Sequence, residues 1–181
     1  MRKVAAFVTL SALVLLSGKV LAFEPNTSDK MELDVQKAIL EIKQKDPGIQ
    51  RFFDDAAGYV VLPSVGKGGI VVGGAFGRGL VIVNELVDGF ASMSQATIGL
   101  QLGGQKYSQF IFFKDQTALN HFKRGNFEFG AQASAVAITA GASADAAYDS
   151  GVAIFTVAAG GLMAEASVGG QRFSYAPKSP D

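Results

Sequence analysis

The chain has 181 residues with 16 basic and 16 acidic side chains, one histidine, no cysteine and no tryptophan. This balance speaks against a nucleic-acid binder, which would carry a clear excess of basic residues. Without cysteine there can be no disulfide, and a single histidine cannot assemble a tetrahedral zinc site of nitrogen and sulfur ligands. The fold must therefore be stabilised by packing and hydrogen bonding.

The first 22 residues have the pattern of a cleavable secretory signal peptide. Arg2 and Lys3 precede an apolar run at 4–16, and small residues follow up to Ala22. The run is shorter than the roughly 20 residues of a membrane-spanning helix, so a retained anchor is the weaker alternative. We expect cleavage between Ala22 and Phe23 and a periplasmic or secreted mature chain. Residues 23–181 should form a single domain with 13 basic and 16 acidic side chains.

Apolar residues at helical spacing predict two helices at the start of this domain. Ser28 or Asp29 can cap a helix that runs to about Asp46. Pro47 then begins a second short helix, for which Asp46 is the N-cap. Because the apolar positions of both lie on one side, we expect the helices to cover a sheet.

From residue 59 onward the apolar residues alternate with a period of two, which predicts strands. A turn at 77–79 is expected between the second and third strands, and Asp88-Gly89 indicates a hairpin. The strands are expected at 59–62, 69–76, 80–83, 90–93, 96–102 and 109–113.

The second half of the chain continues with one helix and further strands. Asp115 can cap a helix that ends near Arg124, with Gly125 as its stop. Strands are expected at 127–138, 152–157, 162–168 and 172–175, with a loop of small residues at 140–147. The predicted class is α+β: a large antiparallel sheet or closed barrel-like core with an N-terminal helical segment and one mid-chain helix.

Sequence patterns typical of catalysis are missing. His121 falls on the polar side of a predicted helix, and no Gly-x-Ser-x-Gly elbow presents a serine nucleophile. The segment from Gly66 to Gly69 lacks the upstream glycine and the following hydroxyl residue of a phosphate-binding loop. We therefore expect no enzymatic activity, no cofactor and no metal ion.

Ordered glycine and aromatic motifs along the chain resemble the SYLF domain family. They are YVVLPSVGKGG at 59–69, GGAFGRG at 73–79, QATIGLQLGGQ at 95–105, IFF at 111–113, GNFEFGAQAS at 125–134 and GLMAEASVGG at 161–170. The resemblance covers almost the whole mature chain and implies a lipid-binding module. Eukaryotic members bind phosphoinositides, and fungal members also bind actin filaments. Such members tend to have Trp-Ser where this chain has Phe90-Ala91, and a Gly-Pro-x-Gly-Arg-like stretch at 138–142.

The resemblance leads us to expect a non-enzymatic cell-envelope protein that binds anionic phospholipid or a related amphiphile. Lys67 and Arg78 are the candidate headgroup-binding residues, because flanking glycines let a ligand approach backbone N–H groups. The alternatives are a structural or protein-interaction module of the envelope and a small outer-membrane β-barrel. The glycine-rich segment around the two cations comprises Gly66, Gly68, Gly69, Gly73, Gly74, Gly77 and Gly79.

Overall fold

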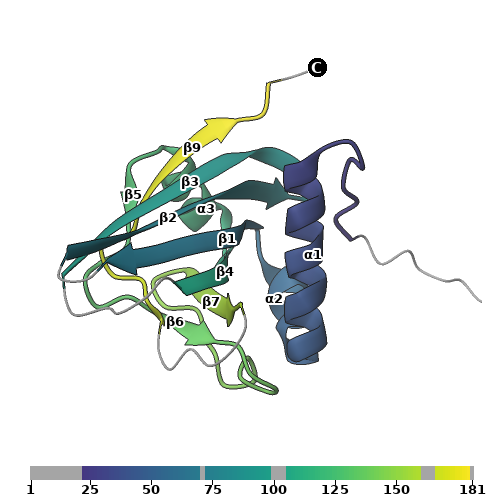
Figure 1. The fold of residues 1–181 in the computed structure, drawn as a ribbon. Coiled ribbons are helices and arrows are strands. Elements are labelled where there is room, and N and C mark those ends of the chain that lie inside the picture. The colour runs from purple at the N-terminus through teal and green to yellow at the C-terminus, as the bar shows by residue number, and fades with distance from the viewer. Residues whose placement is uncertain (1–21, 70–71, 99–104, 160–165, 180–181) are drawn as a thin grey trace, which may run out of the picture.

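The structure is a computed structural model that describes residues 22–69, 72–98, 105–159 and 166–179 (Figure 1). Its helical elements are α1 (Lys30–Lys45), the 3₁₀ turn η1 (Pro47–Ile49), α2 (Gln50–Asp55) and α3 (Gln116–Lys123). Its strands are β1 (Gly58–Gly69), β2 (Val72–Val83), β3 (Leu86–Ile98), β4 (Gln105–Phe113), β5 (Phe127–Glu128), β6 (Ser134–Ala137), β7 (Val152–Ala158), β8 (Ala166–Ser167) and β9 (Arg172–Pro177).

The described strands form one curled sheet in the order β5-β9-β3-β2-β1-β4-β7-β6-β8. Neighbouring strands are antiparallel, apart from β6 and β7, which are parallel. β5 and β6 follow each other closely in the chain but lie toward opposite ends of this order, so the sheet bends round to bring its edges near each other. The predicted α+β class is confirmed, with a curled sheet, N-terminal helices and one mid-chain helix (Figure 1).

Three predictions about strand boundaries and turns were wrong. The hairpin between β2 and β3 turns at Asn84 and Glu85, so Asp88 and Gly89 lie inside β3 and not at the turn. β2 runs without interruption from Val72 to Val83, so residues 77–79 form no turn. The predicted strand at 127–138 is divided into β5 and β6, because residues 129–133 cross from one edge of the sheet to the other. Parts of the strands predicted at 96–102 and 162–168 lie outside the described residues.

The centre of the sheet is apolar on both faces, and each face has its own cover. Phe110 and Phe112 of β4 belong to a core on the outer face, defined here as the face against which α1 and α2 pack. Ile111 and Phe113 belong to a second core on the inner face, together with Leu119 of α3. Alternation of side chains along β4 produces this division, and it explains why the strand reads as one continuous apolar run.

A buried carboxylate fastens the loop at 139–148 to the N-terminal helices. Asp46 is only 2% exposed; its Oδ1 accepts a hydrogen bond from Gly48 N–H at 3.1 Å, and its Oδ2 accepts one from Ser143 N–H at 2.7 Å. Nη2 of Arg51 donates to the carbonyl oxygens of Ser143 and Ala146, each at 2.6 Å. Burial alone would raise the pKa of Asp46, but the hydrogen bonds from Ser143 and Gly48 outweigh it and hold the pKa below its usual value.

An extra residue in β1 creates a bulge at Pro63. Val61 pairs with Leu80 and Ser64 with Arg78, so three steps along β1 match two along β2. The bulge accommodates a proline in a central strand, where its missing N–H would otherwise break the ladder. The bulged backbone presses against Gly79, where an added Cβ would overlap the carbonyl group of Val61. Gly79 is therefore required by close approach of two backbones.

Replacement of Asp46 by asparagine should weaken the link between the loop and the helices. The amide can accept only one of the two N–H bonds and turns its own NH₂ toward the other donor, so we expect a loss of about 2 kcal/mol in the free energy of unfolding at pH 7. Because the folded pKa is lowered, the wild-type advantage should be complete at neutral pH and disappear as the pH falls below about 4. Urea unfolding between pH 3 and 7 measures this. Asp34→Asn, at an exposed ion pair with Lys30, is the matched control and should change little.

Alanine substitutions at Gly79 and Gly66 should separate the glycine required by packing from one that is not. Gly79→Ala should lower the free energy of unfolding by about 3 kcal/mol or more, because the bulged backbone of β1 cannot move away. An added Cβ at Gly66 meets no atom within 4 Å, so Gly66→Ala should stay within about 0.5 kcal/mol of the wild type. Chemical unfolding of the two variants gives the comparison, and equal losses would contradict it.

Candidate functional site

None of the described helices covers one part of the outer face of the sheet. α1 packs on β1 and β2 and lies across one end of the strands, and the strand ends near the β1–β2 connection extend beyond it (Figure 1). Phe76 of β2 is 53% exposed and Phe90 of β3 is 45% exposed. Exposed aromatic rings on a sheet face make this surface a candidate for binding.

The strand register shows which side chains share this uncovered face. Phe76 pairs with Gly66 on one side and with Ser94 on the other, and Gly66 pairs in turn with Lys106. Residues paired across neighbouring strands project from the same face, about 4.8 Å apart per strand. In the adjacent row Arg78 pairs with Ser64 and Ser92. We call this surface the outer patch: Lys106, Gly66, Phe76, Arg78 and Phe90.

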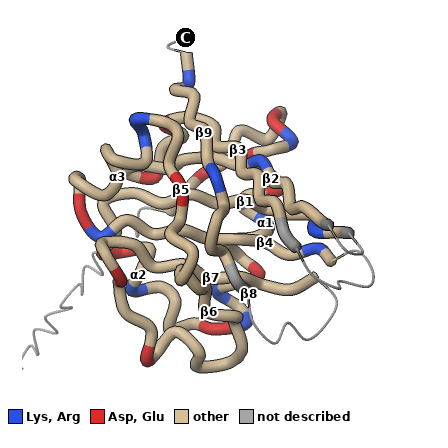
Figure 2. The backbone as a smooth tube through the Cα atoms, turned by 90° about the vertical axis from the view of Figure 1, so that its left-hand side faces the viewer, with Lys and Arg blue, Asp and Glu red and all other residues tan. Residues whose placement is uncertain are grey.

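The outer patch combines positive charge with aromatic surface. The guanidinium of Arg78 lies 5.5 Å from the ring centroid of Phe76, within range of a cation–π contact. Lys106 borders a shallow hollow of about 510 Å³, lined also by Gly66, Lys67, Gln105 and Ala159. Figure 2 shows basic positions at the strand ends beside the grey segments. Such an arrangement can bind an anionic group above an apolar surface.

The predicted glycine-rich segment divides into three groups. Gly66 and Gly68 have open space where a Cβ would lie, and a Cβ at Gly74 would contact only the Gln95 carbonyl at 3.2 Å. Gly77 and Gly79 face the inner side, where an added Cβ would clash with Val65 and Val61 respectively. Gly69 and Gly73 pair with each other beside the β1–β2 connection. Packing therefore explains Gly77 and Gly79 but leaves Gly66 and Gly68 without a structural reason.

The two predicted headgroup residues lie in strands, not in turns, and on opposite faces of the sheet. Arg78 shares the outer face with Leu80, whereas Lys67 pairs with Ala75 and shares the inner face with Val65. The structure thus brings Arg78 together with Lys106, which the sequence analysis missed. Only the pairing of β1 with β4 places Lys106 beside Gly66, so no local pattern could have indicated it.

The inner face contains a polar layer that is largely satisfied within itself. Nε2 of Gln109 donates to Oε1 of Gln171 at 2.8 Å, and the reverse bond is 3.2 Å. Gln171 also donates to the hydroxyl of Tyr107 at 3.4 Å, and burial raises the pKa of Tyr107 to about 12. Both glutamines are fully buried. This reciprocal amide pair ties β4 to the segment before β9 across the inside of the sheet, which is a structural role.

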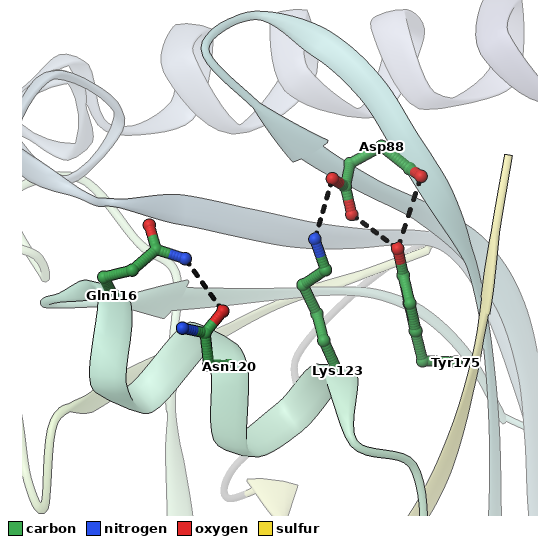
Figure 3. Close-up of polar contacts among 5 residues, drawn as sticks. All are labelled: Asp88, Gln116, Asn120, Lys123 and Tyr175. Carbon is green, nitrogen blue, oxygen red and sulfur yellow. Dashed lines mark hydrogen bonds and ion pairs between the residues drawn. The ribbon is translucent and has the colours of Figure 1, made fainter. Parts of the chain in front are cut away.

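A second bulge presents Asp88 to α3 (Figure 3). The register of β2 and β3 shifts between Val81 and Ile82, so Asp88 is the extra residue in β3. Its Oδ1 lies 2.8 Å from Lys123 Nζ, and its Oδ2 accepts a hydrogen bond from Tyr175 at 2.7 Å. Burial and the bond to Asp88 raise the pKa of Tyr175. The three groups satisfy one another, so the cluster anchors α3 to the sheet.

The described parts of the chain contain neither a cluster of metal ligands nor a membrane-spanning helix. No three of the His, Asp and Glu side chains there gather as a metal ion would require. No helix among the described residues is both long and apolar enough to cross a membrane. His121 is exposed on α3 with its ring 5.4 Å from that of Phe127.

Comparison with known proteins connects this fold to a family of binding modules. Residues 94–178 match the family model Ysc84, described as Las17-binding protein actin regulator. Beta cell expansion factor A from Aeromonas veronii is 28% identical over 138 residues, which are 75% of this chain and 52% of the relative. The chain therefore spans about half the length of this curated relative. The family-model match covers residues 94–178, and together with this relative it supports the resemblance of the chain to the SYLF domain family.

Proposed function

We propose that the protein is a non-enzymatic module that binds anionic phospholipid, or a related anionic amphiphile, through the outer patch. The observation that carries the proposal is the placement of Arg78 and Lys106 around exposed Phe76 on a sheet face without helix cover. The resemblance to the SYLF family supports a lipid-binding or actin-binding module in general. The chemistry of the outer patch favours the lipid.

Each component of the outer patch has a physical role at a membrane surface. The rings of Phe76 and Phe90 can enter the boundary between headgroups and acyl chains, where their burial is favourable. A Lys or Arg near an anionic surface contributes about 1 kcal/mol. The bare backbone at Gly66 lets a headgroup approach between Lys106 and Phe76, because no side chain stands there. The excess of acidic residues in the mature chain makes this local basic surface necessary for binding.

We also propose that the protein is exported and that residues 1–22 are removed. The N-terminal pattern supports this. Phe23, the residue after the expected cleavage point, is 7% exposed and belongs to the outer core, so the folded domain includes it. The N-terminal sequence of protein recovered from the periplasm or the culture medium should begin at Phe23. Full-length protein retained in the cytoplasm would contradict export.

The lipid proposal is tested by co-sedimentation of the protein with vesicles of phosphatidylcholine containing increasing phosphatidylglycerol. Binding should rise with the anionic lipid and fall with added salt. Combined Arg78→Glu and Lys106→Glu should weaken binding by at least about 30-fold, since two favourable charges are lost and two repulsive ones added. Phe76→Ser should weaken binding without changing its salt dependence.

The matched control is Arg124→Glu, which reverses an exposed cation at the end of α3, the helix that packs on the inner face. Arg124→Glu changes the charge by the same amount as Arg78→Glu. Because Arg124 lies outside the outer patch, this variant should bind vesicles within about twofold of the wild type. Equal losses in Arg124→Glu and Arg78→Glu would show that net charge alone governs binding. Binding to filamentous actin but not to vesicles would favour a protein-interaction module instead.

A further inference from the structure

Where the two edges of the curled sheet meet, the described strands are joined by short pairings. Residues 129–133 link β5 to β6. Among the described residues of β7, β6 pairs with Phe155 and Thr156 alone, and its other partner is β8. The first residues of β7 therefore have no β6 partner, and a cavity of about 590 Å³ lies beside them. We call it the seam pocket. Its volume is in the range of pockets that bind small organic molecules.

One wall of the seam pocket is aromatic. Phe127 and Phe129 meet edge to face with centroids 5.1 Å apart, and the His121 ring lies 5.4 Å from that of Phe127. The rest is built mainly of small apolar side chains, which leave room for the body of a ligand. They are Ala118, Ala131, Ala133, Val136, Ala146, Ala147, Val152 and Ala153.

The charge of the seam pocket is opposite to that of the outer patch. No Lys or Arg is among the described residues that line it, whereas Glu128 and Asp149 are. Glu128 is already paired with Arg172 at 2.9 Å. Asp149 has no cationic partner among the described residues, and its Oδ1 accepts only the hydroxyl of Ser150 there. One uncompensated carboxylate therefore faces a pocket with aromatic rings.

The backbone holds Asp149 firmly at the rim. Asp149 and Val152 exchange two hydrogen bonds of 2.9 Å across a two-residue turn. Both central residues have positive φ, 51° at Ser150 and 83° at Gly151, as the tight hairpin turn of type I′ requires. Ser150 is a non-glycine residue in this region, which is uncommon and is found where the surroundings fix the conformation. The turn also abuts Ala118 of α3, where a Cβ on Gly151 would lie 3.2 Å away.

We propose that the seam pocket binds a small organic ammonium ion with an apolar body. The aromatic rings that line the pocket can attract a cation, and Asp149 supplies the opposite charge. The alanines and valines accommodate the apolar body, and the described lining residues, which include no Lys or Arg, disfavour an anion. This site is separate from the outer patch and does not depend on lipid binding.

The test is calorimetric titration of the whole domain with three hexyl compounds below their aggregation concentrations: hexyltrimethylammonium, hexanol and hexanesulfonate. Hexyltrimethylammonium should bind most tightly and hexanesulfonate least. Asp149→Asn should weaken hexyltrimethylammonium about fivefold and leave hexanol unchanged, because only the charge interaction is removed. Ala147→Trp should block all three by filling the pocket, whereas Ala144→Trp, in the same loop but outside the lining, should not.

The Asp149→Asn result can be interpreted even if Ala147→Trp does not fold. Circular dichroism checks that each variant is folded. Similar affinities for the ammonium and the sulfonate would overturn the proposal, as would unchanged ammonium binding in Asp149→Asn. Arg78→Glu should leave hexyltrimethylammonium binding as in the wild type, so failure of the lipid proposal and failure of this one are told apart.

Discussion

The apolar character of both faces of β1 and β4 is the constraint on which the rest of the structure depends. Phe112 and Phe113 are adjacent in sequence and project to opposite sides, so the strand would expose a large apolar surface unless both sides were covered. α1 and α2 cover the outer face, and α3 together with the curl of the sheet covers the inner face. The helical cover of the outer face extends over only part of the strands, whereas the inner core continues to Val65, Ala75 and Tyr107. The outer patch lies where the outer cover stops.

Both candidate surfaces lie where the regular structure is interrupted. The outer patch occupies the outer face beyond and beside α1, and the seam pocket occupies the gap that the short link between β5 and β6 leaves beside β7. Their charges differ in sign, with Arg78 and Lys106 on one and Asp149 on the other. A module with two such surfaces can bind an anionic interface and a cationic small molecule without competition between them.

The glycines of the glycine-rich segment have two different roles, packing and backbone accessibility. Gly79 is needed because the bulged backbone at Pro63 comes too close for any side chain, so it belongs to the fold. Gly66 has open space around it and an ordinary φ, so it keeps backbone accessible in the middle of the outer patch. A glycine-rich motif is therefore a mixture of packing and binding positions, and the environment of each residue separates them.

The sequence by itself determined the elements that depend on neighbouring residues. Asp29, Asp46 and Asp115 cap the helices as expected, and the apolar run at 109–113 forms a strand buried on both faces. Only the tertiary structure decided which side chains meet. Lys67 lies six residues after Val61, so simple alternation would place both on the outer face with Arg78. The single extra residue at Pro63 turns Lys67 to the inner face, because one inserted residue reverses every following side chain. Lys106 reaches the patch through strand pairing, a long-range choice that no local pattern contains.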